Sequence, residues 1–187
     1  KALRQKLLDA LPQAIELVRW VASIPLPKDS QPFVSVALKH PHIYAIEDGL
    51  IAASDGLETG APEYEAHFTE YQQPYSTALF SAYHQQAYLV GPLARINLNH
   101  SLLPENIRAL IAETGLVFPN SNVFTSMAAR AVEILLAMQQ AASLLENYAV
   151  PDLPHVPVTP KAGIAFGATE APRGLLWHRY EVGETGL

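Results

Sequence analysis

The chain has 187 residues, 49% of them hydrophobic and 16% charged, which allows a substantial buried core in one domain or two small ones. Its formal net charge is −6 and its lysines and arginines are scattered, which argues against a nucleic-acid partner because DNA and RNA attract clustered positive charge. It contains no cysteine, which excludes disulfide bonds and thiolate metal ligands within the chain.

The hydropathy pattern predicts a cytoplasmic protein with no membrane partner. No apolar run approaches the roughly 20 residues that a membrane-spanning helix needs. The N-terminal residues also lack the charged-then-apolar pattern of a signal peptide.

Residues 1–30 are predicted to form a helix. Their apolar side chains recur every three or four positions with lysine, arginine, glutamine and glutamate between them, which is typical of a helix with one buried face. Pro12 lies inside this pattern and is expected to kink or split the helix. Pro25 and Pro27 are expected to end it.

Residues 31–100 are predicted to be rich in β-structure. Short strands are expected at 35–38, 43–47 and 50–54, with Asp48-Gly49 as the hairpin turn between the last two, so that a small antiparallel sheet results. His40 and His42 are interpreted as loop residues rather than metal ligands, because no carboxylate or cysteine stands at ligand spacing.

The aromatic stretch 63–83 is predicted to cover this sheet, with its tyrosine hydroxyl groups hydrogen-bonded. The simplest interpretation of each ring is packing without chemistry. A further strand is expected at 87–90, and Gly91-Pro92 is expected to turn the chain after it.

Residues 101–148 are predicted to form the helical core. A helix from about Pro104 is expected to stop at Gly115, and the longest helix is expected at about 123–146. Arg130 and Glu133 are spaced to pair, either as a solvated bridge, which the sequence alone favours, or within a buried network. The residues expected on the buried face of the long helix are Phe124, Met127, Ala131, Ile134, Leu135, Met138, Ala142 and Leu145.

Residues 149–160 are predicted to form a proline-rich strap, because proline stands at every third position from Pro151 to Pro160. The strap is expected to be semi-rigid. It would hold the segment that follows it at a fixed distance from the long helix.

Residues 161–187 are predicted to form a turn that presents functional groups, followed by a strand. Pro172 fixes its own φ and Gly174 permits a sharp exit, so Arg173 is expected to point in a set direction. From Leu175 the alternating pattern predicts a strand, and the turn at 183–186 is expected to return a second one. Composition alone favours an ordinary turn whose arginine meets a carboxylate.

The order of residues in this segment favours a functional interpretation. The run G-A-T-E-A-P-R-G-L-L-W-H, from Gly167 to His178, resembles the E-A-P-R-G-x-L-x-H signature of the large subunit of nickel-iron hydrogenases, especially the cytoplasmic, multimeric kind. Further resemblance covers 70–80, 88–95 and the helix with Ala129-Arg130-Ala-Val-Glu133. The resemblance implies an α+β fold, in which long core helices of the large-subunit bundle accompany a small antiparallel sheet region.

The same resemblance implies a role for each residue of the signature. Arg173 is expected to be catalytic and to lie over the metal centre that splits H₂. There its guanidinium would stabilise developing charge or polarise the bound hydrogen. Pro172, Arg173 and Ala171 are expected to border the nickel-iron centre beside the cyanide ligands of its iron. Glu170, His178, Arg130 and Glu133 are the candidate members of the surrounding network. The implied partners are an iron-sulfur small subunit, electron-transfer subunits and H₂.

The absence of cysteine departs from the family pattern, in which two Cys-x-x-Cys pairs hold the metals. We therefore expect the central fragment of a longer subunit, inactive by itself, with no metal ligand and no bound nickel-iron centre of its own. The opening of the chain inside a helical pattern at Lys1 and its end at Leu187, just after a turn, favour this interpretation.

Two alternatives stay open. The quinone-site subunit of respiratory complex I shares this ancestry without the cysteines, but it carries a lysine where this chain has Arg173. A non-catalytic interaction module that keeps only the scaffold is the other. Cys-x-x-Cys pairs in the flanking coding sequence would separate the hydrogenase from both.

Overall fold

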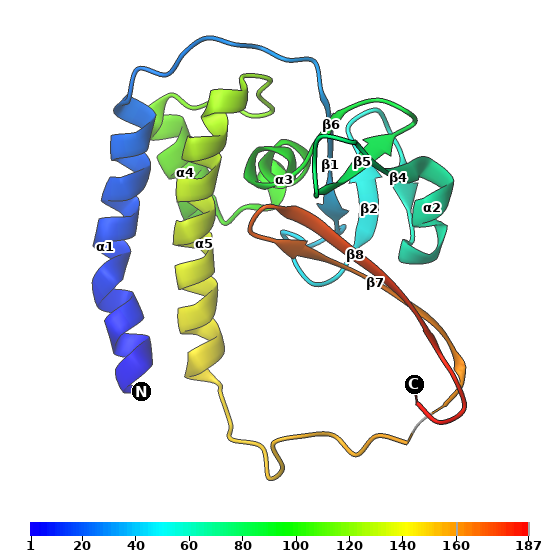
Figure 1. The fold of residues 1–187 in the computed structure, drawn as a ribbon. Coiled ribbons are helices and arrows are strands. Elements are labelled where there is room, and N and C mark those ends of the chain that lie inside the picture. The colour runs from blue at the N-terminus through cyan, green and yellow to red at the C-terminus, as the bar shows by residue number, and fades with distance from the viewer. Residues whose placement is uncertain (160, 187) are drawn as a thin grey trace.

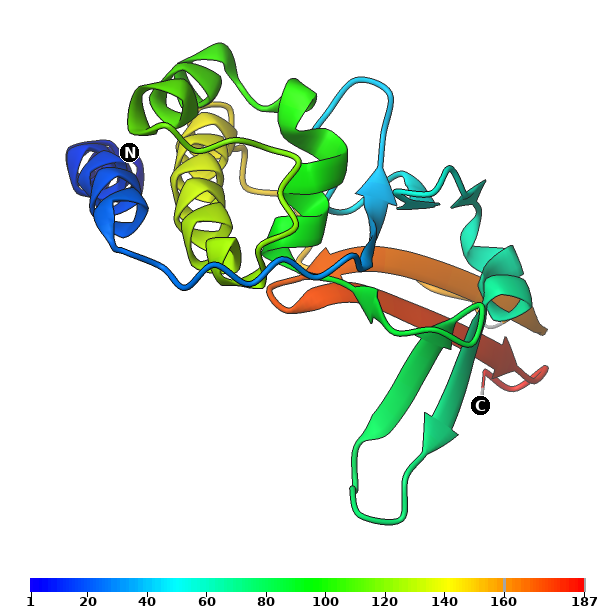
Figure 2. The ribbon, with the colours of Figure 1, turned by 90° about the horizontal axis from the view of Figure 1, so that it is seen from above.

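The structure is a computed structural model that describes residues 1–159 and 161–186. Helices gather on one side of the molecule and small sheets on the other, as Figures 1 and 2 show. The predicted α+β class is confirmed. Within these two stretches, none of the helices combines the length and the apolar character that crossing a membrane requires.

The helical side is built on two long helices, α1 (Ala2–Ser23) and α5 (Ser126–Glu146), which pack along each other (Figure 1). The helix α4 (Glu105–Thr114) completes the group and ends at Gly115 in a left-handed conformation, as predicted. The chain runs through Pro12 without interrupting α1, so the predicted split is wrong. The side chain of Pro12 is exposed.

The buried face of α5 agrees with the predicted one only in part: Ala131, Leu135 and Ala142 are buried as predicted, and other predicted residues are not. Leu135 is 1% exposed, but its neighbour Ile134 is 41% exposed, and Phe124 and Met127 are also exposed. The helix is apolar on almost every side, so spacing by itself did not identify the face that packs. The prediction that this is the longest helix is also wrong, because α5 has 21 residues and α1 has 22. The residues buried on α5 are Ala128, Ala129, Ala131, Val132, Leu135, Leu136 and Ala142.

The main sheet has four strands in the order β3-β2-β1-β6. These are β1 (Val34–Lys39), β2 (Leu50–Ala53), β3 (Glu58–Thr59) and β6 (Tyr88–Leu89). Neighbours pair antiparallel except β1 and β6, which are parallel, so the sheet is mixed rather than purely antiparallel.

The predicted strand at 43–47 is wrong. Lys39 pairs directly with Leu50, and the chain between them is a loop rather than a second strand with an Asp48-Gly49 turn. Tyr44 and Ala45 are buried in this loop, and their burial explains why the sequence there resembles a strand. Gly49 closes the loop with φ 142°, where a Cβ atom would lie only 2.5 Å from the carbonyl oxygen of Lys39.

The aromatic stretch forms a turn of helix and a hairpin. The 3₁₀ turn Ala61–Glu63 and α2 (Tyr64–His67) lead into β4 (Phe68–Gln72), which pairs with β5 (Leu79–Tyr83) in an arm that projects in Figure 2. The expected hydroxyl partners are present for two tyrosines of this stretch: Tyr83 donates to Asp55, and Tyr64 shares a hydrogen bond with Ser81. The hydroxyl groups of Tyr71 and Tyr75 have no hydrogen-bond partner among residues 1–159 and 161–186.

The stretch 31–100 ends in a helix that the sequence did not predict, α3 (Pro92–Asn99). Gly91-Pro92 begins this helix instead of turning a strand. Proline suits the first helical position because the N–H that it lacks would have no partner there. Two short 3₁₀ turns, His100–Leu102 and Val123–Thr125, precede α4 and α5.

The last elements are β7 (Gly163–Ala171) and β8 (Gly174–Val182), which pair along their whole length in a two-stranded ribbon. The strand from Leu175 is confirmed, but its partner is the preceding β7 rather than a strand after 183–186. Gly163 and Gly167, two glycines from which the sequence predicts a flexible backbone, lie instead in a paired strand.

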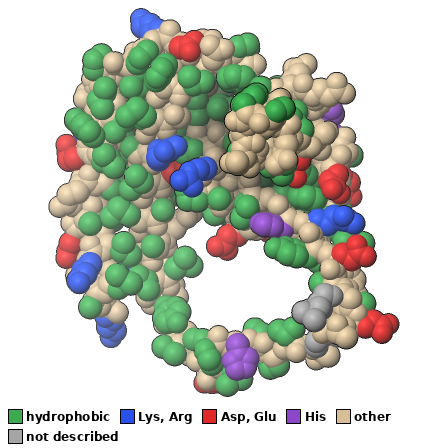
Figure 3. All heavy atoms as spheres, in the orientation of Figure 1, with side chains coloured by type: hydrophobic (Ala, Val, Ile, Leu, Met, Phe, Trp, Pro, Cys, Tyr) green, Lys and Arg blue, Asp and Glu red, His purple; other side chains and the backbone are tan. Residues whose placement is uncertain are grey.

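The strap leaves α5 and runs exposed to solvent, and Pro160, its last proline, lies outside the described residues. Figure 3 shows an opening through the molecule that is bounded by α5, the strap and the β7–β8 ribbon. Apolar side chains along this path, among them Leu144, Val150, Val156 and Ile164, are exposed.

Candidate functional site

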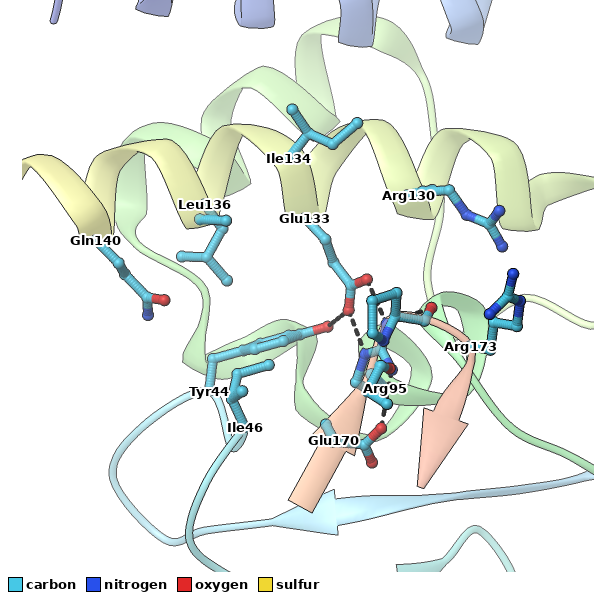
Figure 4. Close-up of a pocket in the computed structure, with 13 residues that line it drawn as sticks. Tyr44, Ile46, Arg95, Arg130, Glu133, Ile134, Leu136, Gln140, Glu170 and Arg173 are labelled. Carbon is cyan, nitrogen blue, oxygen red and sulfur yellow. Dashed lines mark hydrogen bonds and ion pairs between the residues drawn. The ribbon is translucent and has the colours of Figure 1, made fainter. Parts of the chain in front are cut away.

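A hollow of about 670 Å³ lies where the tip of the β7–β8 ribbon meets α3, α5 and the loop after β1 (Figure 4). Most of its wall is apolar, and its polar groups come from four separate segments of the chain. Its lining residues include Tyr44, Ile46, Arg95, Arg130, Glu133, Leu136, Gln140 and the turn residues 170–173.

Arg95, on α3, is the centre of the polar groups. Its side chain is 3% exposed, and it donates two hydrogen bonds to Glu133, from Nε to Oε1 at 2.6 Å and from Nη2 to Oε2 at 2.7 Å. It donates a third from Nη1 to Glu170 Oε2 at 2.8 Å. Two more reach the carbonyl oxygens of Ala171, at 2.8 Å, and Pro172, at 3.4 Å.

The two carboxylates keep this guanidinium charged. Burial lowers the pKa of Arg95, but the hydrogen bonds and negative charges of Glu133 and Glu170 outweigh burial and raise the pKa above its usual value. Arg95 is therefore a permanent cation between two acids, held in the bidentate geometry that a guanidinium makes with a carboxylate.

Glu133 reaches this cluster from α5 and receives a further hydrogen bond from the Tyr44 hydroxyl at 2.7 Å. Burial and the adjacent charge of Glu133 raise the pKa of Tyr44 far above its usual value, so the phenol stays protonated and remains a donor. Figure 4 shows the Tyr44 and Glu133 side chains converging from the loop and the helix.

Glu170 joins β7 to the main sheet. Its side chain is 1% exposed, and its Oε1 accepts a hydrogen bond from the Leu38 backbone N–H at 2.8 Å. Its own backbone N–H donates to the carbonyl oxygen of Ile46 at 2.7 Å. Burial raises the pKa of Glu170, and the hydrogen bonds from Arg95 and Leu38 oppose this rise.

The ribbon tip, Ala171 to Gly174, lies directly against the start of α3. Gly91 and Gly174 both have positive φ, at 88° and 142°. A Cβ atom on Gly91 would lie 2.9 Å from the Arg173 carbonyl oxygen, and one on Gly174 would lie 2.7 Å from Cβ of Val90. Two backbones therefore approach as closely as only glycine permits.

Arg173 leaves this tip with an exposed side chain that makes no hydrogen bond or ion pair with residues 1–159 or 161–186. The backbone of Arg173 is therefore fixed, as expected, but no side chain of the described residues holds its guanidinium in one direction. Arg130 is also exposed, and Figure 4 shows both guanidinium groups on the same side of the hollow.

Most of the sequence-predicted site residues come together here. Arg130, Glu133, Glu170, Ala171, Pro172 and Arg173 all line the hollow, although Arg130 and Arg173 lie 43 positions apart in the sequence. His178 does not: it is exposed in the middle of β8, opposite Gly167, and its ring stacks on that of Tyr180.

The solvated Arg130–Glu133 bridge that the sequence favours is wrong, because Glu133 pairs with Arg95. The alternative, a buried network, holds for Glu133 but not for Arg130, which is exposed. An exposed pair three residues apart on a helix contributes only about 0.2–0.5 kcal/mol. A bidentate partner inside the protein is the stronger competitor for the same carboxylate.

Sequence reasoning missed Arg95 and Tyr44 as members of the site. A signal for Arg95 was present, because it stands in the apolar run Leu93-Ala94-Arg95-Ile96 just after Gly91-Pro92. An arginine within a buried run requires partners. Tyr44 carried no such signal, since its expected place was a strand.

The described residues could not hold a nickel-iron centre by themselves. The chain has no cysteine, and no group of three or more His, Asp or Glu within 1–159 and 161–186 is arranged to bind a metal ion. The hollow itself presents a mostly apolar wall with the Arg173 side chain among its lining residues.

No protein-family model matches the sequence, but curated relatives do. The chain is 28% identical over 184 residues to the alpha subunit of sulfhydrogenase 1 from Pyrococcus furiosus, a match that covers 96% of this chain and 43% of the relative. It is 34% identical over 140 residues to a vhu subunit of the F420-non-reducing hydrogenase from Methanocaldococcus jannaschii, covering 70% of this chain and 33% of that protein.

Solved structures share the fold. A chain of an NAD⁺-reducing [NiFe]-hydrogenase in the H₂-reduced state matches with a TM-score of 0.72 and 22% identity, covering 100% of this chain and 47% of that one. A [NiFeSe] hydrogenase variant of Desulfovibrio vulgaris Hildenborough matches with a TM-score of 0.62 and 20% identity, covering 99% and 47%. This chain thus spans less than half the length of the relatives it matches.

Proposed function

We propose that this chain, which is homologous over nearly its whole length to part of hydrogenase alpha subunits and has the fold of nickel-iron hydrogenases, is a segment of a catalytic large subunit. The full-length subunit would catalyse the reversible heterolytic oxidation of H₂ to protons and electrons. The observation that carries this proposal is the hollow, where Arg130, Glu133 and the Glu170–Arg173 turn meet although they are distant in sequence.

The nickel-iron centre would be held by residues outside this chain. That centre, when bound, supplies the site at which H₂ is split. The opening bounded by α5, the strap and the ribbon is where we expect the rest of the subunit to lie, with the metal-ligand cysteines. The segment alone is expected to be inactive.

Within the hollow, the residues of this chain would shape the environment of the reaction. Ile134, Leu136 and Pro172 would form a wall that excludes water, so that a fixed charge acts at greater strength. Arg173 would supply that charge. Charge stabilisation is the role that suits an arginine best, because its guanidinium stays protonated in proteins.

The partners expected from the family resemblance are electron-transfer subunits, among them an iron-sulfur small subunit. The relatives named above are themselves subunits, which supports assembly with other chains. A location in the cytoplasm belongs to the same proposal, since the motif resembles that of the cytoplasmic, multimeric group.

The absence of cysteine favours a second candidate, a scaffold or quinone-site-like subunit without metals. Arg173 at the position where the quinone-site subunit has lysine argues for the hydrogenase. The coding sequence on either side of this segment separates the two, because only a hydrogenase requires Cys-x-x-Cys pairs there.

The experiment that tests the proposed function is Arg173→Lys in the full-length subunit within its complex. A lysine keeps the charge but not the planar fork of the guanidinium. Losing one hydrogen-bond donor that stabilises a transition state lowers kcat by about 10²–10³-fold. We expect nickel and iron contents equal to those of the wild type and H₂ turnover reduced by that factor.

Arg179→Lys is the matched control, because Arg179 lies on the same ribbon with an exposed side chain and does not line the hollow. It should leave turnover unchanged. Equal turnover in the Arg173 and Arg179 variants would remove the proposed role of Arg173, and a full-length protein without nickel or iron would remove the proposed function itself.

A further inference from the structure

We propose that Arg95 is the positioning residue of this site: it fixes the ribbon tip against α3 and so sets where Arg173 stands at the hollow. The inference rests on the proposed function for its effect on turnover. Its structural half stands on contacts within this chain and can be tested separately.

The first contact is with the backbone of the tip. Nη1 of Arg95 donates to the Ala171 carbonyl oxygen at 2.8 Å, and Nη2 donates to that of Pro172 at 3.4 Å. These are the two residues immediately before Arg173. Carbonyl groups at a hairpin tip are otherwise free to face solvent, so a buried guanidinium that collects both defines the orientation of the tip.

The second feature is the full use of the guanidinium. An arginine has five N–H donors, and Arg95 makes five hydrogen bonds, to Glu133, Glu170, Ala171 and Pro172. Its plane is thus set by acceptors on α5 and β7 at once. A lysine ammonium has three donors and would leave acceptors of this set without a partner.

The third feature is that the carboxylates are themselves anchored. Glu133 accepts a hydrogen bond from the Tyr44 hydroxyl, and Glu170 accepts one from the Leu38 N–H of the main sheet. The helix α3 that carries Arg95 is tied to the same strand, because Asn99 Nδ2 donates to the Leu38 carbonyl oxygen at 2.9 Å. These contacts consequently fix the position of the tip relative to α3, α5 and the main sheet together.

The glycines show that the tip is seated closely as well as hydrogen-bonded. Gly91 faces the Arg173 carbonyl and Gly174 faces Val90, at separations that leave no room for a methyl group. Val90, Gly91 and Arg95 therefore act as one dock for the tip. The segment that resembles the family at 88–95 and the E-A-P-R-G segment are the two halves of a single contact.

The experiment uses the full-length subunit in its complex, with Arg95→Lys as the main variant. Amide hydrogen exchange is followed for peptides from the ribbon, and kcat, KM for H₂ and metal content are measured in parallel. Arg19→Lys is the matched control, since Arg19 also pairs with two glutamates, Glu16 and Glu113, but on the surface.

We expect exchange at 170–174 to rise by about tenfold or more in Arg95→Lys, because acceptors in the interior lose their donors, and to stay unchanged in Arg19→Lys. Turnover should fall through kcat with metal content retained. A purely structural role would instead lower assembled enzyme and activity together, with exchange raised equally in α1, α5 and the ribbon.

Glu133→Gln carries the test if Arg95→Lys does not assemble, because it leaves Arg95 in place and removes one anchor of its guanidinium. The same amides should exchange faster, to a smaller extent. Ribbon exchange equal to that of Arg19→Lys in either variant would overturn the proposal. If exchange rises as expected in an assembly that has no hydrogenase activity, the positioning role stands and the proposed function fails.

Discussion

Replacing Gly91 by alanine tests the seating of the ribbon tip without changing any charge. The Cβ atom would lie 2.9 Å from the Arg173 carbonyl oxygen and 3.3 Å from its carbon, whereas ordinary contacts begin at 3.4 Å. The tip and the start of α3 must therefore separate by about 0.5 Å at this point, or the backbone must change conformation.

The cost has two parts. Gly91 has φ 88° and ψ −161°, a conformation nearly restricted to glycine, and an alanine held there is strained by about 1–3 kcal/mol. Forcing a methyl group into a packed contact adds about 1–3 kcal/mol. We expect Gly91→Ala to lower the free energy of unfolding by about 2–6 kcal/mol and, since misplacement by ~1 Å can cost about a hundredfold in rate, to lower turnover roughly tenfold.

The assay compares Gly91→Ala with Gly56→Ala in the full-length subunit, by denaturant unfolding and by H₂ uptake. Gly56 has φ 108° but no atom within 4 Å of its would-be Cβ, so it isolates backbone strain from the collision. Equal losses of stability and no loss of turnover in the two variants would refute the reasoning that the tip is seated on Gly91.

Two other predictions concern the core and the aromatic region. Leu135→Ala should cost about 2–5 kcal/mol in unfolding experiments, whereas Ile134→Ala, at a more exposed position of α5, should cost much less, and a reversed order would contradict the buried face described above. Burial raises the pKa of Tyr64 and of Tyr83 from 10.0 to about 12. The contribution of each tyrosine to the free energy of unfolding is therefore complete below pH 10 and is lost as the pH rises to about 12. Unfolding measured along this pH range should show stability falling, and Tyr64→Phe with Tyr83→Phe should flatten the fall.

Local signals predicted local structure well. The helix α4 and its end at Gly115 followed from a proline at its start and a glycine after its last turn. The strand after Arg173 followed from alternation of side chains. Each of these depends on residues a few positions apart, so the sequence contains the whole cause.

Predictions failed where contacts with segments distant in the sequence determine the local structure. The stretch 43–47 has the composition of a strand, but its burial comes from packing in a loop beside the site. The strand β7 was missed because its glycines suggest flexibility, and only pairing with β8 holds them extended. Ile134 was placed on the wrong face because α5 is apolar on nearly all sides.

The sequence by itself indicated two of the segments that meet at the hollow, because the E-A-P-R-G run and the Arg130–Glu133 helix both resemble the same family and both line it. It also determined that no thiolate ligand comes from this chain. The tertiary structure alone decided which charges meet. Arg95 lies 38 positions from Glu133 and 75 from Glu170. Their charges come within hydrogen-bonding distance only because α3 packs against α5 while the ribbon tip lies against the start of α3, in an interior where charges must pair.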